Sequence, residues 1–195
     1  MKFYFKILSF IACLYLVSAF CGTYAQEVMD KQITVIKKKV QFDTWKQILS
    51  AKDDFSYGKF DVRNEMVDPW RIQRIQKITD DQCNTTRYIL ATTDDPKKAS
   101  EIIRVSVTHC PLRDNAADKL LNYLLGIQRP DIKLIEDKTM TIGDIAVHVP
   151  EEPEPAILFV RGNIFIVVEN AGEKVPADIR KLANTFDELL TKEQQ

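Results

Sequence analysis

Apolar residues occupy both alternating positions of the segment ILFVRGNIFIVVEN, residues 157–170. Gly162 and Asn163 interrupt this run, and such a pair is typical of a two-residue hairpin loop. Pairing across that turn places Phe159 opposite Ile166 and leaves both faces of the hairpin apolar. A strand with one wet face would alternate apolar and polar residues. The pattern therefore predicts a hairpin that is covered on both sides.

A second hairpin is predicted from CNTTRYILATT (83–93) and EIIRVSVTHC (101–110), which flank the turn-like stretch DDPKKAS. One antiparallel register places Cys83 opposite Cys110 and gathers apolar side chains on one face. Segregated faces are what fixes the register of a strand pair. In an oxidising compartment two facing cysteines form a disulfide. We therefore predict a Cys83–Cys110 disulfide.

Two amphipathic helices are predicted, over residues 114–126 and 178–190, because leucines and other apolar residues recur there at helical spacing. From residue 83 the predicted order is β-β-α-β-β-β-β-α, with a Pro-rich acidic loop at 150–155. This order predicts an α+β fold, a largely antiparallel sheet covered by helices in an α/β sandwich. We expect both helices on one sheet face and N-terminal helices on part of the other.

The chain before residue 83 is less regular. Residues 1–25 have the order of a secretory signal peptide: lysines, an apolar run, then small residues before a cleavage site after Ala25. An uncleaved anchor is one alternative, and a lipoprotein at Cys21 is another, which the bulky Phe20 disfavours. Residues 26–195 are predicted to form one domain, with 26–82 its less regular part.

Charge and hydropathy limit the function classes of the secreted or periplasmic chain. Loss of Lys2 and Lys6 with residues 1–25 leaves 25 basic against 28 acidic residues, a net charge of −3. A nucleic-acid-binding surface would make the chain strongly basic, so nucleic acid is not an expected partner. No second long apolar run follows, so no transmembrane span is expected in the mature chain.

The sequence shows no established motif for catalysis or cofactor binding. His109 and His148 are its two histidines, and neither belongs to a metal-ligand spacing, so no metal or cofactor is expected. His109 adjoins Cys110, but neighbours on a strand point to opposite faces and do not share a proton easily. Adjacent acidic pairs in the loops are typical of solvated charge.

Aromatic residues gather in the N-terminal part, at Trp45, Tyr57 and Trp70, with Arg71 beside the last. Exposed, these residues would form a ligand-binding face for a sugar or a partner. Buried, they would form a satellite core beneath a long loop, which is the commoner arrangement. The segment DPWRIQRIQKI, 68–78, fits either a short helix or an irregular strand.

The run FVRGN, with its following strand and the helix ending LANTFDELL, resembles the C-terminal part of uncharacterised secreted bacterial proteins. The likeness covers about the last third of the chain and implies no particular activity. The architecture also resembles small secreted folds of the PsbP-like group, as a likeness of topology alone.

Two functions of different class remain. The first is a non-catalytic binding or accessory module of the cell envelope, with a protein or polysaccharide partner. The second is a small hydrolase in which His109 or His148 acts with a nearby carboxylate. A histidine and a carboxylate converging in a cleft would favour the hydrolase, and a conspicuous exposed aromatic or apolar patch would favour the binding module.

Overall fold

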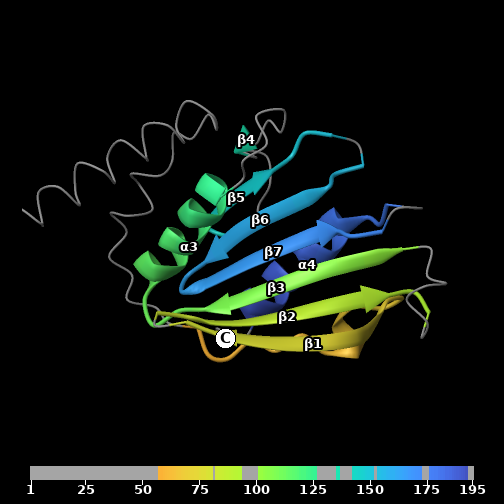
Figure 1. Cartoon of the computed structure of the whole chain (residues 1–195), viewed down its shortest axis with the longest axis horizontal. Coiled ribbons are helices and arrows are strands. Elements are labelled where there is room, and N and C mark those ends of the chain that lie inside the picture. Colours follow the sequence, from red (N-terminus) through yellow and green to blue (C-terminus); the bar gives the residue numbers. More distant parts are fainter. Residues whose placement is uncertain are drawn as a thin grey trace, which may run out of the picture. The chain divides into compact units, whose positions relative to one another are not determined.

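The computed structural model describes residues 57–80, 82–93, 101–126, 135–136, 142–151, 153–172 and 176–192 (Figure 1). The expected signal peptide and the helix predicted around Trp45 lie outside these residues. The described part carries one antiparallel sheet of seven strands and two α-helices, which confirms the α+β class. None of the described helices is both long enough and apolar enough to span a membrane.

The sheet has the strand order β1-β2-β3-β7-β6-β5-β4. Its elements are, in chain order, the 3₁₀ turn η1 (Asn64–Met66), β1 (Arg71–Thr79), β2 (Asn84–Ala91), β3 (Ile102–His109), α3 (Arg113–Gly126), β4 (Ile135–Glu136), β5 (Ile145–His148), β6 (Ala156–Arg161), β7 (Ile164–Asn170) and α4 (Ile179–Lys192). From β2 onward this is the predicted order of elements.

Both predicted hairpins have the predicted registers. In the β2–β3 pair, Thr86 lies opposite Val107, and Cys83 and Cys110 form a disulfide just beyond the paired residues, with Cα atoms 4.4 Å apart. In the β6–β7 pair, Phe159 lies opposite Ile166. The ambiguous segment before Cys83 is strand β1, whose register shifts between Ile72 and Arg74. That β-bulge accounts for the broken periodicity of its sequence.

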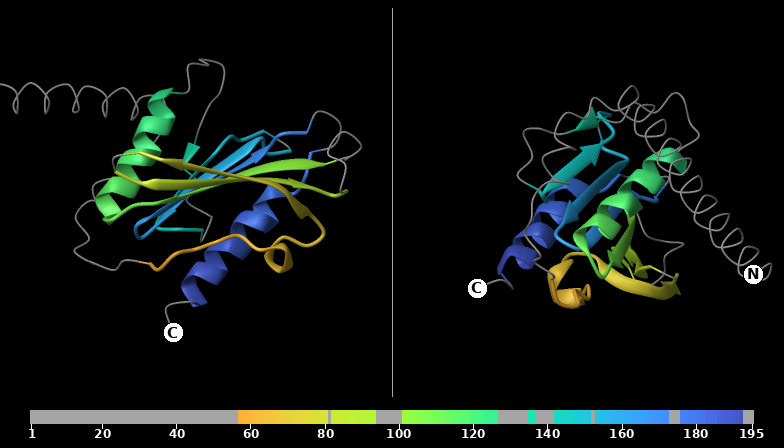
Figure 2. Two further views of the ribbon diagram at one scale, coloured as in Figure 1. Left: turned by 60° about the horizontal axis from the view of Figure 1, so that its bottom comes forward. Right: turned by 90° about the vertical axis from the view of Figure 1, so that its left-hand side faces the viewer.

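The two helices lie on opposite faces of the sheet, which corrects the expectation that they share one face (Figures 1 and 2). On one face α4 and the segment 57–70 pack into a single hydrophobic core with β2, β3, β6 and β7. α3 contacts β6 and β7 from the other face. Because both faces of β6 and β7 are apolar, each face needs its own cover, and one helix supplies each.

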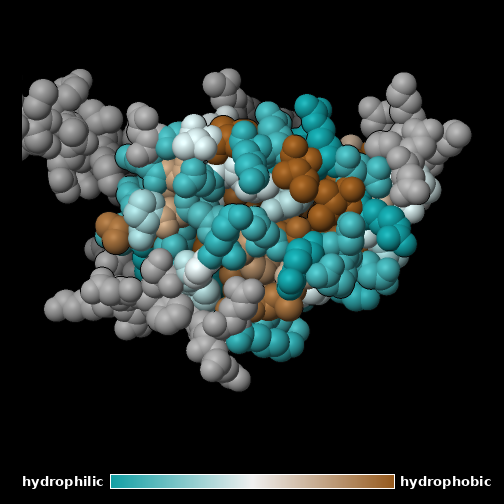
Figure 3. All heavy atoms as spheres, turned by 90° about the horizontal axis from the view of Figure 1, so that it is seen from below, coloured by the Kyte–Doolittle hydropathy of each residue, from teal (hydrophilic) through white to brown (hydrophobic). Residues whose placement is uncertain are grey.

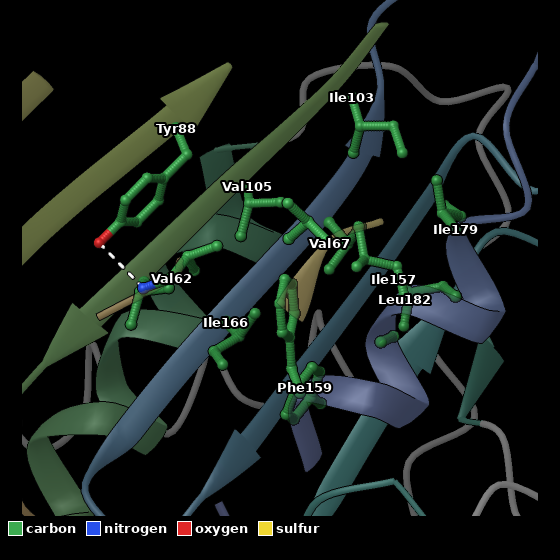
Figure 4. Packing of buried hydrophobic residues seen from close by; sticks show 14 of the residues in the cluster. Val62, Val67, Tyr88, Ile103, Val105, Ile157, Phe159, Ile166, Ile179 and Leu182 are labelled. Atoms are coloured by element: carbon green, nitrogen blue, oxygen red, sulfur yellow. Dashed lines mark hydrogen bonds between the residues drawn. The ribbon is translucent and has the colours of Figure 1, made fainter. Parts of the chain in front are cut away.

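The main core is formed by aliphatic and aromatic side chains from the sheet and α4 (Figure 4). Phe159 is fully buried at its centre. The ring of Phe60, from the segment before β1, lies edge-on to the ring of Phe186 of α4, with centroids 5.9 Å apart. The N-terminal segment thus belongs to the same core, because it closes the space that α4 leaves beside β2 and β3.

Candidate functional site

A hollow of about 770 Å³ opens where the end of β5, the Pro-rich loop and the first turn of α4 meet. We call it the α4 pocket. Its walls carry three prolines, and its polar groups come from both sides of the loop. Prolines suit such a wall because they hold the chain extended without offering N–H groups that need partners. The described residues that line it are His148, Pro150, Glu151, Pro153, Glu154, Pro176, Ala177, Asp178, Ile179 and Arg180.

Three side chains in this pocket are bound to one another. Glu154 Oε1 lies 2.7 Å from Nδ1 of His148, and the Glu154 carboxylate also accepts hydrogen bonds from Nε and Nη2 of Arg180. His148 is the last residue of β5, Glu154 lies in the loop that returns the chain to β6, and Arg180 is in the first turn of α4. Three separate elements therefore deliver one ionic cluster to the pocket.

The cluster orients His148 and balances part of the local charge. The His148 side chain is 10% exposed and that of Glu154 is 12% exposed, so both are held in a partly dehydrated setting where such bonds are stronger than in water. A carboxylate bonded to one ring nitrogen fixes the orientation of an imidazole. The described lining still holds three carboxylates against one guanidinium, because Glu151 and Asp178 also belong to it.

The described lining residues include no serine, threonine or cysteine, so they supply no side-chain nucleophile. Nor does any group of three or more potential metal ligands converge within the described part of the chain. The chemistry open to this site is therefore recognition of a ligand, or activation of a water molecule by His148.

His109, the other histidine considered for catalysis, binds the main chain. Its Nε2 lies 2.9 Å from the carbonyl oxygen of Phe60 and 3.2 Å from the Phe60 nitrogen. The ring thus fastens the N-terminal segment to the end of β3. Among the described residues Asp61 lies close enough for a favourable charge interaction, but the hydrogen bonds of the ring go to the main chain of Phe60. The structure thus gives His109 a structural environment.

The structure describes three of the four predicted ligand-binding residues, and these three differ in their exposure. Trp45 lies outside the described residues. Trp70 is 7% exposed within the core, and its indole N–H donates to Glu101 across 2.9 Å. Tyr57 packs against the same core as a partly buried residue. Arg71 is exposed on β1, the edge strand.

A second polar cluster, at the β6–β7 turn, was not expected from the sequence. Arg161 donates to both carboxylate oxygens of Asp187, at 2.8 and 2.6 Å, and to Asp144 at 3.2 Å. These hydrogen bonds and charges raise the pKa of Arg161 above its ordinary value, against the effect of burial. Burial, the largest cause, raises the pKa of neighbouring Tyr57 as well. In the sequence, the one sign of this cluster was the position of Arg161 beside the predicted turn.

The same turn is fixed by Asn163, which is 4% exposed. Its amide donates to the carbonyl of Cys110 at 2.7 Å and accepts from the Tyr57 nitrogen at 2.6 Å. The hydrogen bonds of Arg161 and Asn163 all join segments of the described chain that are distant in sequence. The cluster therefore stabilises the fold, and the α4 pocket is the better candidate for function.

Comparison with family models, with curated proteins and with solved structures finds no match for this chain.

Proposed function

We propose that the chain is a secreted, non-catalytic binding or accessory module of the cell envelope, built as a PsbP-like α/β sandwich, and that the α4 pocket is its ligand site. The observation that carries this proposal is the pocket itself, whose central histidine, carboxylate and guanidinium hold one another in place. A rigid hollow with apolar walls and a few fixed polar groups is the usual form of a small-ligand site.

The charge of the pocket selects the ligand. Among the described lining residues three carboxylates face one guanidinium, and Glu151 and Asp178 are exposed at the surface. The exposed rings of Pro150, Pro153 and Pro176 supply the apolar contacts. A cationic group on an apolar body matches both features, since it would pair with the exposed carboxylates and pack on the prolines.

Titration of the ¹⁵N-labelled chain with agmatine and with a short lysine-proline peptide tests this proposal. We expect amide shifts confined to residues 148–154 and 177–180, and loss of those shifts in Asp178→Asn with Glu151→Gln. Asp61→Asn is the matched control, because this carboxylate is exposed and distant in sequence from the pocket. The proposal is contradicted if no amide shifts appear, or if Asp61→Asn removes them as fully as the double variant does.

A hydrolase is the second proposal, and the His148–Glu154 contact of 2.7 Å inside a pocket favours it, since a histidine, a carboxylate and a cleft converge there. Glu154 would hold the imidazole while Nε2 takes a proton from an attacking water molecule. We rank it second because the described lining offers no side-chain nucleophile, which leaves a water molecule activated by His148 as the one route to hydrolysis that these residues support.

Turnover of a panel of nitrophenyl esters and glycosides separates the two proposals. A hydrolase should lose at least about a hundredfold in kcat with His148→Gln, the usual contribution of a general base. A binding module should show no turnover above that of His148→Gln.

A further inference from the structure

The outer face of strands β1, β2 and β3 is unusually rich in arginine. The β2–β3 register separates it from the core face, which carries Tyr88 and Leu90. Four guanidinium groups lie on this face, together with hydroxyl, amide and aliphatic side chains, and these three strands place no acidic residue there. We call it the arginine surface; its arginines are Arg71, Arg74, Arg87 and Arg104.

The registers fix the spacing of three of these arginines. Arg74 and Arg104 both lie opposite Ile89, from its two sides, so they stand two strand spacings, or about 9.6 Å, apart. Arg87 is two residues from Ile89 along β2, which puts it diagonal to both, at about 7–8 Å. Three cations therefore surround one isoleucine.

These cations have little compensation from the protein. Arg71, Arg74 and Arg87 form no ion pair with any described residue, and the Nε atom of Arg87 is buried without a hydrogen-bond partner in that part of the chain. Of the four arginines, Arg104 alone forms an ion pair with a described residue, Glu169 of β7, at 3.4 Å. Glu169 also accepts a hydrogen bond from Tyr123 of α3, where that helix borders the surface. Crowded like charges destabilise a sheet, and an anionic ligand would remove that repulsion.

We propose that the arginine surface binds a carboxylated or sulfated polysaccharide. Guanidinium groups present fixed pairs of donors that match carboxylate and sulfate oxygens. The charges spread over three strands, which suits an extended polymer with repeated charges. Ser106 adds a partly exposed hydroxyl group on the same face for the sugar hydroxyls. The hydroxyls of Thr85 and Thr108 bond to each other at 2.9 Å.

Other polyanions fit the surface less well. Single-stranded nucleic acid is bound by stacking on aromatic rings, and β1–β3 place no aromatic residue on this face. Membrane surfaces are bound by amphipathic helices or lysine-rich segments with inserted apolar residues. The side of the molecule at β1 is mixed, with polar and apolar side chains (Figure 3). β1 exposes Ile75 and Ile78, at 54% and 38%, but the register places only Ile78 on the arginine surface.

Binding of labelled heparin and polygalacturonate to the purified chain, followed by fluorescence anisotropy at several salt concentrations, tests this inference. Arg74→Gln and Arg87→Gln should each weaken binding about fivefold, the effect of one exposed ion pair. Each should also reduce the slope of the logarithm of affinity against the logarithm of salt concentration by about one, because one fewer cation contacts the polymer. Arg63→Gln is the matched control, since Arg63 is exposed and paired with Glu65 away from these strands; it should leave the affinity unchanged.

Glu169→Gln gives a change of the opposite sign. It removes the carboxylate beside Arg104 while its amide oxygen still accepts from Tyr123, so polysaccharide binding should tighten about threefold. A purely structural role of Glu169 would give no tightening. Absence of binding to both polymers, equal weakening by Arg63→Gln, or tighter binding to anionic phospholipid vesicles or DNA would each overturn the proposal. Unchanged circular dichroism of each variant shows that the fold is retained.

Discussion

Reduction of the Cys83–Cys110 disulfide should lower the stability of the fold by a calculable amount. The two cysteines are 27 residues apart in sequence, and closing a loop of that length removes about 3.5 kcal/mol of conformational freedom from the unfolded chain at 25 °C. Both cysteines are buried, at 2% and 4% exposed, so the thiols formed on reduction keep nearly the same packing. The loss should therefore come mainly from the unfolded state.

Urea denaturation of a chain beginning at Gln26, with and without a phosphine reductant, measures this loss. Such a chain retains only these two of the four cysteines. With a slope of about 2 kcal/mol/M, the unfolding midpoint should fall by about 1.7 M, and the melting temperature by about 7–14 °C. The variant with Cys83→Ala and Cys110→Ala is the control, because the reductant should not affect it. Equal midpoints for the oxidised and reduced chains would refute the reasoning.

Three further predictions concern contacts that the structure shows directly. Asp187→Asn should destabilise the fold by about 2–3 kcal/mol in urea denaturation, because it weakens a buried, doubly bonded ion pair with Arg161. Gly143→Ala should cost at least about 2 kcal/mol, since its φ is +67° and a Cβ would lie 2.6 Å from the Val160 carbonyl oxygen. Hydrogen bonds, the largest from Lys119, lower the pKa of Asp80 to about 2, so its stabilising contribution is present above the ordinary value of 3.8 and is lost as pH falls towards 2; carboxyl NMR titration should show the pKa rising in Lys119→Gln.

Control substitutions of the same chemical type at exposed positions distinguish these effects from a general loss of stability. Glu188→Gln removes an ion pair of 4.0 Å whose partners are both about 70% exposed, and should change stability by less than about 0.5 kcal/mol. Gly126→Ala meets no atom within 4 Å and should be neutral or slightly stabilising. Costs of Asp187→Asn or Gly143→Ala no larger than those of their controls would contradict the structural reasoning, as would an Asp80 that titrates near 3.8 in the unmodified chain.

The strand registers and the disulfide could be predicted because they depend on period-two patterns within short segments. A shift of one residue would have moved the apolar side chains of β2 and β3 to the wrong face and separated Cys83 from Cys110. The same local logic predicted the two-sided burial of β6 and β7. It did not decide the nature of β1, whose bulge breaks the alternation on which such a prediction depends.

The placement of the helices and the candidate site could not be read in this way. An amphipathic stripe shows that a helix packs on the sheet but does not say on which face. The stripe of α4 is much more pronounced than that of α3, and this difference does not assign either helix to a face. The α4 pocket depends on Glu154 and Arg180, which are 26 positions apart and meet only because α4 begins beside the Pro-rich loop. His148 was considered from the start because it is one of two histidines, while its partners carried no local signal.

The position of β1 at the end of the strand order has a consequence for self-association. A nine-residue edge strand offers unpaired main-chain groups to which another chain can add as a further strand. Here Arg71, Arg74 and Lys77 place a cation near that edge every three residues, and the bulge distorts its hydrogen-bonding line. A second copy adding its own β1 side by side would bring like charges together. Arg71 and Arg74, which belong to the proposed polysaccharide site, thus also oppose growth of the sheet into aggregates.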